Sequence, residues 1–304
     1  MIDSRHQTFL TLCAVGSYTK TAQHLHLSQP AVTQHIQYLE GMYNCRLVVY
    51  ENRRVVLTPA GEQLREMLER MAADAKRFRR TLQKNGGTGK NIVFGATLSI
   101  GEYLMPQVIA ELLEHDASLN VHMEVANSQI LLERLRNGEL DFALIEGMID
   151  KARYHALVFS EERFVPICAP NCSLAGRTVD FREILQFPLV LREKGSGTRE
   201  IFEHILGQYN YSVSSFQKVI EIGNMAAIKH LVARNIGISF MYELVAANDV
   251  HGGELAIVDI AGFDVRREFN FVCLRGSAFV DQSLEYFRMF KEAAHRISSA
   301  QRIT

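Results

Sequence analysis

The run SQPAVTQHI, which begins at Ser28, constrains this chain more than any other feature of its sequence. The Ser28 hydroxyl can accept from a free amide of a first helical turn, and Pro30 fits that turn because its missing N–H costs little there. At helical spacing, Val32, Ile36 and Leu39 fall on one face. The opposite face holds Gln29, Pro30, Thr33, Gln34 and Gln37. The run therefore predicts a helix with one packing face and one face of hydrogen-bonding groups.

Two shorter helices are predicted before this one. The first, over residues 6–15, has an apolar stripe and ends at Gly16, and Ser17 is the expected cap of the second, over residues 18–25. Three helices in this order are typical of a helix-turn-helix, whose last helix reads base edges in the major groove of DNA. An ordinary surface helix also carries Gln and Thr, so the motif alone leaves both interpretations open.

A β-like stretch at residues 46–57 follows, with Asn52, Arg53 and Arg54 at its turn. We interpret this hairpin as a wing whose cations contact phosphates. Residues 1–90 contain 13 Lys and Arg against 7 Asp and Glu, a balance of +6, whereas the whole chain carries -1. Such an imbalance also arises by chance on solvated helices, so it supports the motif without replacing it.

On these residues the chain resembles the LysR-type transcriptional regulators, from GSYTKTAQHLHLSQPAVTQHIQYLE through LTPAGE at residues 57–62 and on to the C-terminus. It departs from the family pattern at residues 47–50, which read LVVY where Leu-Phe-x-Arg is frequent, and at Gln34, where Arg is frequent. The expected partners are double-stranded DNA and a small-molecule effector, with RNA polymerase as a further possible partner. The candidate DNA contacts are Ser17, Thr19, Lys20, Ser28, Gln29, Pro30, Thr33, Gln34, Gln37, Arg53 and Arg54.

A long helical pattern occupies residues 59–83, and residues 85–89, NGGTG, then predict a flexible break. Apolar side chains repeat at 4-3-4-3-4 spacing, the a/d seam of a coiled coil. A helix packed on its own domain would also carry an apolar stripe, but a strict repeat favours a second copy, and a reader of two half-sites has to be dimeric. We expect a homodimer and, beyond it, a homotetramer. The seam consists of Leu64, Leu68, Met71, Ala75, Phe78 and Leu82.

From residue 91 the pattern changes to strands at residues 92–96, 119–125 and 142–145, with helices at 102–113 and 131–135 between them. This order predicts a doubly wound α/β sheet. A second round of strands is expected at residues 164–167, 189–191, 219–222 and 236–240, with helices from Thr198 and Met225, before residues 269–274 and 282–297 return to the first lobe. The resemblance implies a two-lobed domain of the periplasmic-binding-protein type. The predicted domains are 1–60 (winged helix-turn-helix), 61–90 (dimerisation helix and hinge) and 91–304 (effector domain, with lobe I at about 91–163 and 269–304 and lobe II at about 164–268).

Four strand-to-helix turns of this region are rich in hydroxyl, amide and glycine groups. Each alone is more typical of a helix cap, but as a set at the carboxyl ends of strands they favour a small anion. GSGTR at residues 195–199 resembles the segment of branches that include regulators of carbon fixation and sulfur assimilation, which implies that Thr97, Ser99 and Thr198 contact the effector. Lys194 and Arg199 would add charge. The candidate effector contacts are Thr97, Leu98, Ser99, Ile100, Asn127, Ser128, Gln129, Glu146, Gly195, Ser196, Gly197, Thr198, Arg199 and Asn224.

Other classes of protein fit less well. A periplasmic solute-binding protein would need a signal peptide and would lack the first 60 residues, and no nucleophile elbow, HExxH or P-loop indicates an enzyme. No apolar span is long enough for a membrane helix, so we expect a cytoplasmic protein. The cysteines are odd in number and scattered, and Cys168 with Cys172 lacks further ligands, so we expect free thiols and neither a metal nor a cofactor.

Overall fold

The computed structural model describes residues 2–51, 54–83 and 90–301. Within that part the chain forms two compact units. Unit 1 contains the described residues up to position 83 together with residues 136–139 and 276–279, and unit 2 contains the others. The predicted wing cation Arg53 and the predicted hinge at residues 85–89 lie outside the described residues.

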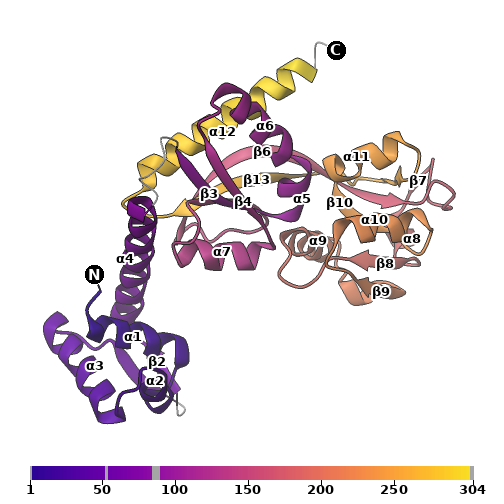
Figure 1. The fold of residues 1–304 in the computed structure, drawn as a ribbon. Helices are drawn as coiled ribbons and strands as arrows, with labels where there is room; N and C mark the ends of the chain where they lie inside the picture. Colours follow the sequence, from indigo (N-terminus) through magenta and orange to yellow (C-terminus); the bar gives the residue numbers. More distant parts are fainter. Residues whose placement is uncertain (1, 52–53, 84–89, 302–304) are drawn as a thin grey trace. The chain divides into compact units, whose positions relative to one another are not determined.

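Unit 1 begins with three helices, drawn in indigo and purple in Figure 1. Gly16 ends the first of them in the left-handed conformation, with φ of 68°. Ser17 caps the second by accepting from the Lys20 amide, and Ser28 caps the third by accepting from the Ala31 amide. The predicted start and stop signals are therefore confirmed. The helices are α1 (Ser4–Val15), α2 (Tyr18–His24) and α3 (Gln29–Tyr43).

The wing follows as an antiparallel hairpin of β1 (Val48–Glu51) and β2 (Arg54–Leu57). It lies against the core of the helical part, because Leu47 at its base is buried and Val48, Val55 and Leu57 pack on that core. The core itself is formed by side chains of α1, α3 and the long helix that follows the wing. Its buried members are Phe9, Leu12, Ile36, Leu39, Leu47, Leu64 and Leu68.

The long helix α4 (Pro59–Gln83) has the predicted bounds, but its apolar seam is divided. Leu64 and Leu68 are 6% and 2% exposed in the core of unit 1, so the expectation that they pair with a second copy is wrong. Met71, Phe78 and Leu82 are 49%, 53% and 54% exposed. Only the second half of the helix therefore carries apolar side chains that the chain itself leaves uncovered.

Unit 2 is built on one seven-stranded sheet of order β10-β6-β13-β5-β3-β4, with β11 paired to β6. Strands β4 and β5 both pair with β3 in parallel, as the doubly wound prediction requires. Strands β6 and β13 are long and antiparallel, and they run from one lobe into the other (Figure 1). The strands are β3 (Asn91–Ala96), β4 (Asn120–Val125), β5 (Phe142–Glu146), β6 (Tyr154–Cys168), β10 (Ser239–Tyr242), β11 (Ala256–Ile257) and β13 (Val265–Leu274).

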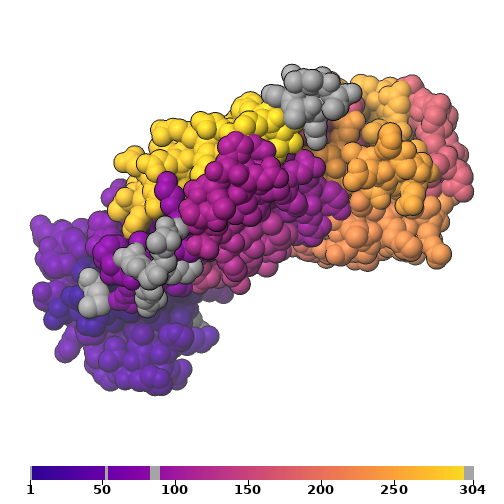
Figure 2. Space-filling model, turned by 45° about the horizontal axis from the view of Figure 1, so that its top comes forward, coloured from indigo at the N-terminus to yellow at the C-terminus, as the bar shows by residue number. Residues whose placement is uncertain are grey.

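The helices of lobe I differ from the prediction at one place. The helix expected over residues 102–113 begins earlier, at Leu98, and is broken at Leu104 because Pro106 occupies the first turn of a new helix and cannot continue the old one. The last helix lies beside α6, and Figure 2 shows it in yellow along the surface. These helices are α5 (Leu98–Tyr103), α6 (Met105–His115), α7 (Ser128–Arg136) and α12 (Val280–Gln301).

Lobe II has a second parallel pair of strands, joined to β10 through a bridge between Leu189 and Ile238. Several of its short elements were not predicted. Its helices are α8 (Phe181–Ile184), α9 (Gly197–Gln208), α10 (Met225–Ala233), α11 (Glu243–His251) and the 3₁₀ turn Val213–Ser215, and its further strands are β7 (Thr178–Val179), β8 (Pro188–Leu191), β9 (Lys218–Glu221) and β12 (Asp259–Ile260). The predicted fold class, a winged helix-turn-helix with a two-lobed α/β domain, is confirmed.

Candidate DNA interface and effector site

The polar face of α3 is open. Gln34 and Gln37 are exposed, while Val32, Ile36 and Leu39 are buried on the opposite side. The amide side chains can therefore donate to and accept from base edges without breaking the fold. Thr19, Lys20 and Pro30, which were predicted from the same motif, are exposed as well.

Some predicted DNA contacts already have partners within the chain. The Thr33 hydroxyl accepts from Gln29 Nε2 at 3.1 Å and donates to the Gln29 carbonyl at 3.2 Å. Ser17 and Ser28 serve as helix caps. These residues hold the shape of the motif, whereas Gln34 and Gln37 are the amides best placed to read bases.

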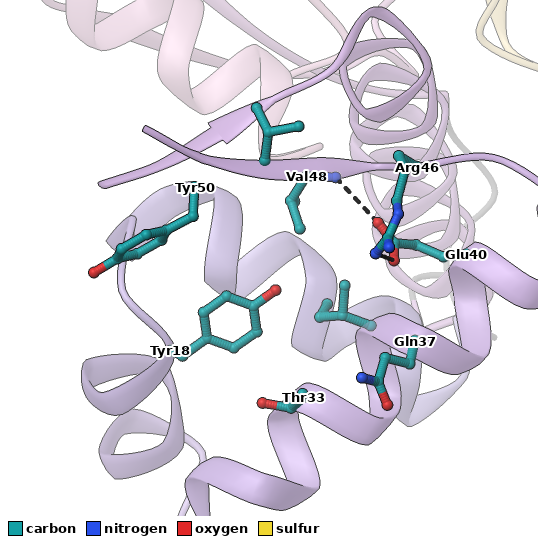
Figure 3. Close-up of a pocket in the computed structure, with 9 residues that line it drawn as sticks. Tyr18, Thr33, Gln37, Glu40, Arg46, Val48 and Tyr50 are labelled. Atoms are coloured by element: carbon teal, nitrogen blue, oxygen red, sulfur yellow. Dashed lines mark hydrogen bonds and ion pairs between the residues drawn. The ribbon is translucent and has the colours of Figure 1, made fainter. Parts of the chain in front are cut away.

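A pocket of about 350 Å³ lies between α3 and the wing. Figure 3 shows Thr33 and Gln37 on one side of it and Tyr18 and Tyr50 on the other. Tyr50 is 69% exposed, and neither tyrosine was predicted as a site residue. An exposed aromatic residue on the wing is the signal in the sequence that could have identified it.

Glu40 ties the wing to the recognition helix. Its carboxylate accepts from the Leu47 amide at 2.9 Å and the Val48 amide at 3.4 Å, and it pairs with Arg46 at 3.0 Å (Figure 3). The Arg46 side chain is 78% exposed, so its charge stays available to a phosphate. Among the described residues, the wing carries two cations. Arg46 lies in the segment before β1, and Arg54, which is exposed, begins β2.

The predicted effector contacts meet around Glu146, the last residue of β5. One carboxylate oxygen, Oε1, accepts from the Thr198 hydroxyl at 2.6 Å and the Ser99 hydroxyl at 3.4 Å. The Ser128 hydroxyl donates to the Glu146 carbonyl at 3.1 Å. Residues from α5, α7 and α9, far apart in sequence, are thus brought together on one strand end.

The approach of α9 to this strand end depends on glycine. A Cβ at Gly197 would lie 2.3 Å from the Glu146 carbonyl oxygen and 2.7 Å from Ser128 Oγ. Gly195 has φ of 87°, and a Cβ there would meet Gln129 Oε1 at 2.9 Å. The two glycines of the GSGTR segment therefore allow close contact between the lobes.

Glu146 is 1% exposed, and burial raises the pKa of its carboxyl group. Hydrogen bonds from Thr198, including its backbone amide, and from Ser99 act in the opposite direction, as does the charge of Arg192. The free amide of α9 that was predicted to bind an anion is thus already directed at a carboxylate of the chain.

Several buried polar atoms in this region have no hydrogen-bond partner among the described residues. They belong to side chains that are 3% exposed or less. Such atoms cost free energy unless a ligand or water satisfies them. They are Thr97 Oγ1, Glu146 Oε2, Arg192 Nη1, Ser196 Oγ and Tyr242 Oη.

Other predicted effector contacts have structural roles. Asn127 and Asn224 each accept from a backbone amide three residues later, as helix caps do. The Arg199 guanidinium binds Glu203 at 2.7 Å and Glu221 at 2.6 Å, so its charge is neutralised within lobe II. The expectation that Arg199 adds positive charge to the site is therefore not supported.

Leu98 and Ile100 lie on α5, with Ile100 fully buried, while Gln129 is exposed.

The cysteines are free thiols in the structure, and Cys168 lies within hydrogen-bonding reach of Cys172. Burial raises the pKa of Cys168 to about 12, which leaves it a poor nucleophile. Within the described part of the chain, no three metal-binding side chains come together, and no helix is long and apolar enough to cross a membrane.

Comparison with known proteins accounts for both units. Residues 4–62 match the bacterial regulatory helix-turn-helix proteins of the lysR family, and residues 85–290 match the LysR substrate binding domain. The chain is 28% identical to the transcriptional regulator CysL of Bacillus subtilis over 88% of this chain and 89% of that protein. It is 25% identical to the RuBisCO operon transcriptional regulator of Allochromatium vinosum, covering 89% of each.

Solved structures agree in fold. A cysteine-to-serine mutant of Corynebacterium glutamicum OxyR with bound H2O2 has a TM-score of 0.61 at 20% identity and covers 99% of this chain and 96% of its own. The regulatory domain of Synechocystis CcmR in complex with 2-PG has a TM-score of 0.58 at 24% identity and covers 65% of this chain and 96% of its own. With both halves matched, the chain belongs to the LysR family of DNA-binding transcriptional regulators, which are not enzymes.

Proposed function

We propose that this regulator reads its operator through Gln34 and Gln37 of α3 and holds the DNA backbone through Lys20, Arg46 and Arg54. The observation that carries this assignment is the exposed amide face of a helix whose other face is fully buried. Because DNA is its partner, the protein acts in the cytoplasm. RNA polymerase as a further partner stays a prediction.

The proposed active form is a dimer, with a tetramer as the further expectation. Its support is the half-exposed stripe of Met71, Phe78 and Leu82 on the second part of α4, which a second copy of the helix would cover. Two recognition helices would then meet two half-sites of an operator.

The proposed signal is a small metabolite with an anionic group, bound where Glu146 meets α9. The buried hydroxyls of Thr97 and Ser196 and the free Arg192 nitrogen support this proposal, because they are donors without partners among the described residues. The domain needs no cofactor in this proposal. CcmR, whose fold is similar, has been solved with 2-PG.

DNA specificity tests the first proposal. Gln34→Ala is expected to cost about 1–3 kcal/mol at one base pair of each half-site, because an amide loses its hydrogen bonds to one base. Arg54→Ala is expected to weaken binding to all sequences alike and to reduce the salt dependence. Competition binding with operator and random duplexes at several salt concentrations measures both effects. Equal losses on operator and random DNA for Gln34→Ala would exclude base reading by this residue.

A further inference from the structure

The buried side chains around Glu146 offer a ligand both signs of charge. Glu146 Oε1 is occupied by two hydroxyl donors, but Oε2 is buried and has no partner among the described residues. Arg192 binds Glu193 through Nε and Nη2, at 2.8 and 2.9 Å, and its buried Nη1 is left over. One acceptor that carries negative charge and one donor that carries positive charge therefore remain unsatisfied.

The two charges belong to the same site. The guanidinium of Arg192 acts electrostatically on the Glu146 carboxyl group, so the two side chains lie within each other's field. Thr97 follows β3, whose register places Ala96 beside Leu144 of β5, and Ser196 immediately precedes the glycine that touches Glu146. Thr97 and Ser196, whose hydroxyls have no partner among the described residues, consequently belong to segments that adjoin Glu146.

An anion alone fits this arrangement poorly. A carboxylate already takes the place that an anion would occupy at the start of α9, because it accepts from both the hydroxyl and the backbone amide of Thr198. A simple anion beside the ionised carboxylate would meet a like charge in a buried setting. A ligand that brings its own cationic donor would instead satisfy Glu146 Oε2.

We propose that the effector is a zwitterion of the α-amino-acid class, with its ammonium group on Glu146 and its carboxylate on the hydroxyls of Thr97 and Ser196 and on Arg192. This inference rests on the proposed sensing function and specifies the ligand further. Its discriminating feature is the ammonium group, since the anionic half of the ligand is shared with simple oxyanions.

The test is thermal denaturation of the full-length protein with the proteinogenic amino acids as probes. Each amino acid is compared with the same acid lacking the amino group and with the same amine lacking the carboxylate, for alanine propionate and ethylamine. At least one amino acid is expected to raise the Tm, because a ligand that binds only the folded state stabilises it. Neither of its two truncated forms is expected to do so.

Glu146→Gln is the central variant, since it keeps the shape and removes the charge. It is expected to lower the affinity for the active amino acid by about ten-fold or more, the effect of losing a charged hydrogen bond. Glu200→Gln is the matched control, because Glu200 is an exposed carboxylate on the same helix α9. Far-ultraviolet circular dichroism and the ligand-free Tm report whether each variant is folded, and the comparison of probes on the unmodified protein decides the ligand class regardless.

Failure of this inference can be separated from failure of the sensing function. If sulfate, phosphate, 2-phosphoglycolate or an acid without an amino group raises the Tm and Thr198→Val weakens that effect, the site senses anions and the zwitterion assignment is wrong. If no probe raises the Tm, the zwitterion assignment is also wrong. If an amino acid binds but Glu146→Gln and Thr198→Val leave its affinity unchanged, it binds elsewhere, and both proposals for this site fall.

Discussion

The two halves of α4 should respond differently to truncation of their apolar side chains. Leu68 is 2% exposed and packs in the core of unit 1 together with Phe9 and Leu39. Replacing a buried leucine with alanine costs about 2–5 kcal/mol, through lost burial and the cavity that remains. Phe78 is 53% exposed, so Phe78→Ala should change the stability of a single chain by less than about 1 kcal/mol.

Hydrogen exchange on the full-length protein measures this difference locally. A loss of about 2 kcal/mol corresponds to about a 30-fold fall in protection, and for Leu68→Ala it should appear throughout α1 and α3. The same peptides should be unchanged in Phe78→Ala. In sedimentation the two positions are expected to rank the other way round. Phe78→Asp should weaken association of the chains, because its carboxylate would be buried between two helices.

Either of two outcomes would contradict this division of α4 into a buried and an exposed half. If Leu68→Ala left exchange in α1 and α3 unchanged and instead separated the dimer, the seam would be an interface between copies along its whole length. If Phe78→Asp remained dimeric at low concentration, the exposed half of α4 would not be the interface.

Two further predictions concern unit 2. Gly197→Ala should lower the Tm by several degrees and abolish the response to effector, because its Cβ would lie 2.3 Å from the Glu146 carbonyl oxygen. Gly207→Ala on the same helix, where the space around the glycine is open, should raise stability by up to about 1 kcal/mol. Thermal denaturation of both variants checks this prediction, and a Gly197→Ala variant with an unchanged Tm would contradict it. Burial raises the pKa of Glu146 above the ordinary value of 4.5, so the folded state holds this proton more tightly than the unfolded state. The contribution of Glu146 to stability should therefore be fully present below pH 4.5 and be lost as the pH rises from there through the raised pKa. Unfolding by urea at several pH values should show less loss of stability over this range for Glu146→Gln than for the unmodified protein, and identical pH profiles would contradict the assignment.

Local signals in the sequence predicted the helix-turn-helix well. The caps Ser17 and Ser28, the stop at Gly16 and the bounds of α4 depend on a few neighbouring residues, and all four are present as expected. The burial of Leu64 and Leu68 could not be predicted in this way. A repeat in one helix shows that one face is apolar, but it does not show whether the covering surface comes from the same chain.

The strand β6 shows where periodicity fails. Its last four residues before Cys168 were predicted, but the part before Phe164 was missed. Within that part, residues 154–159 read YHALVF, and residues 160–163 read SEER and pair with residues 266–268 of β13, which are charged as well. The charged stretch is half-buried or exposed, so it lacks the apolar alternation by which strands are recognised.

Glu146 is the residue whose role depends most on the fold. It is separated from Thr198 by 52 positions, and the four turns rich in hydroxyls and amides looked equivalent in sequence. The structure distinguishes them, because Asn127 and Asn224 cap their own helices while the start of α9 faces a carboxylate. The anion expected at that helix is thus partly supplied by the chain itself, which is why the ligand that we propose adds a positive charge there.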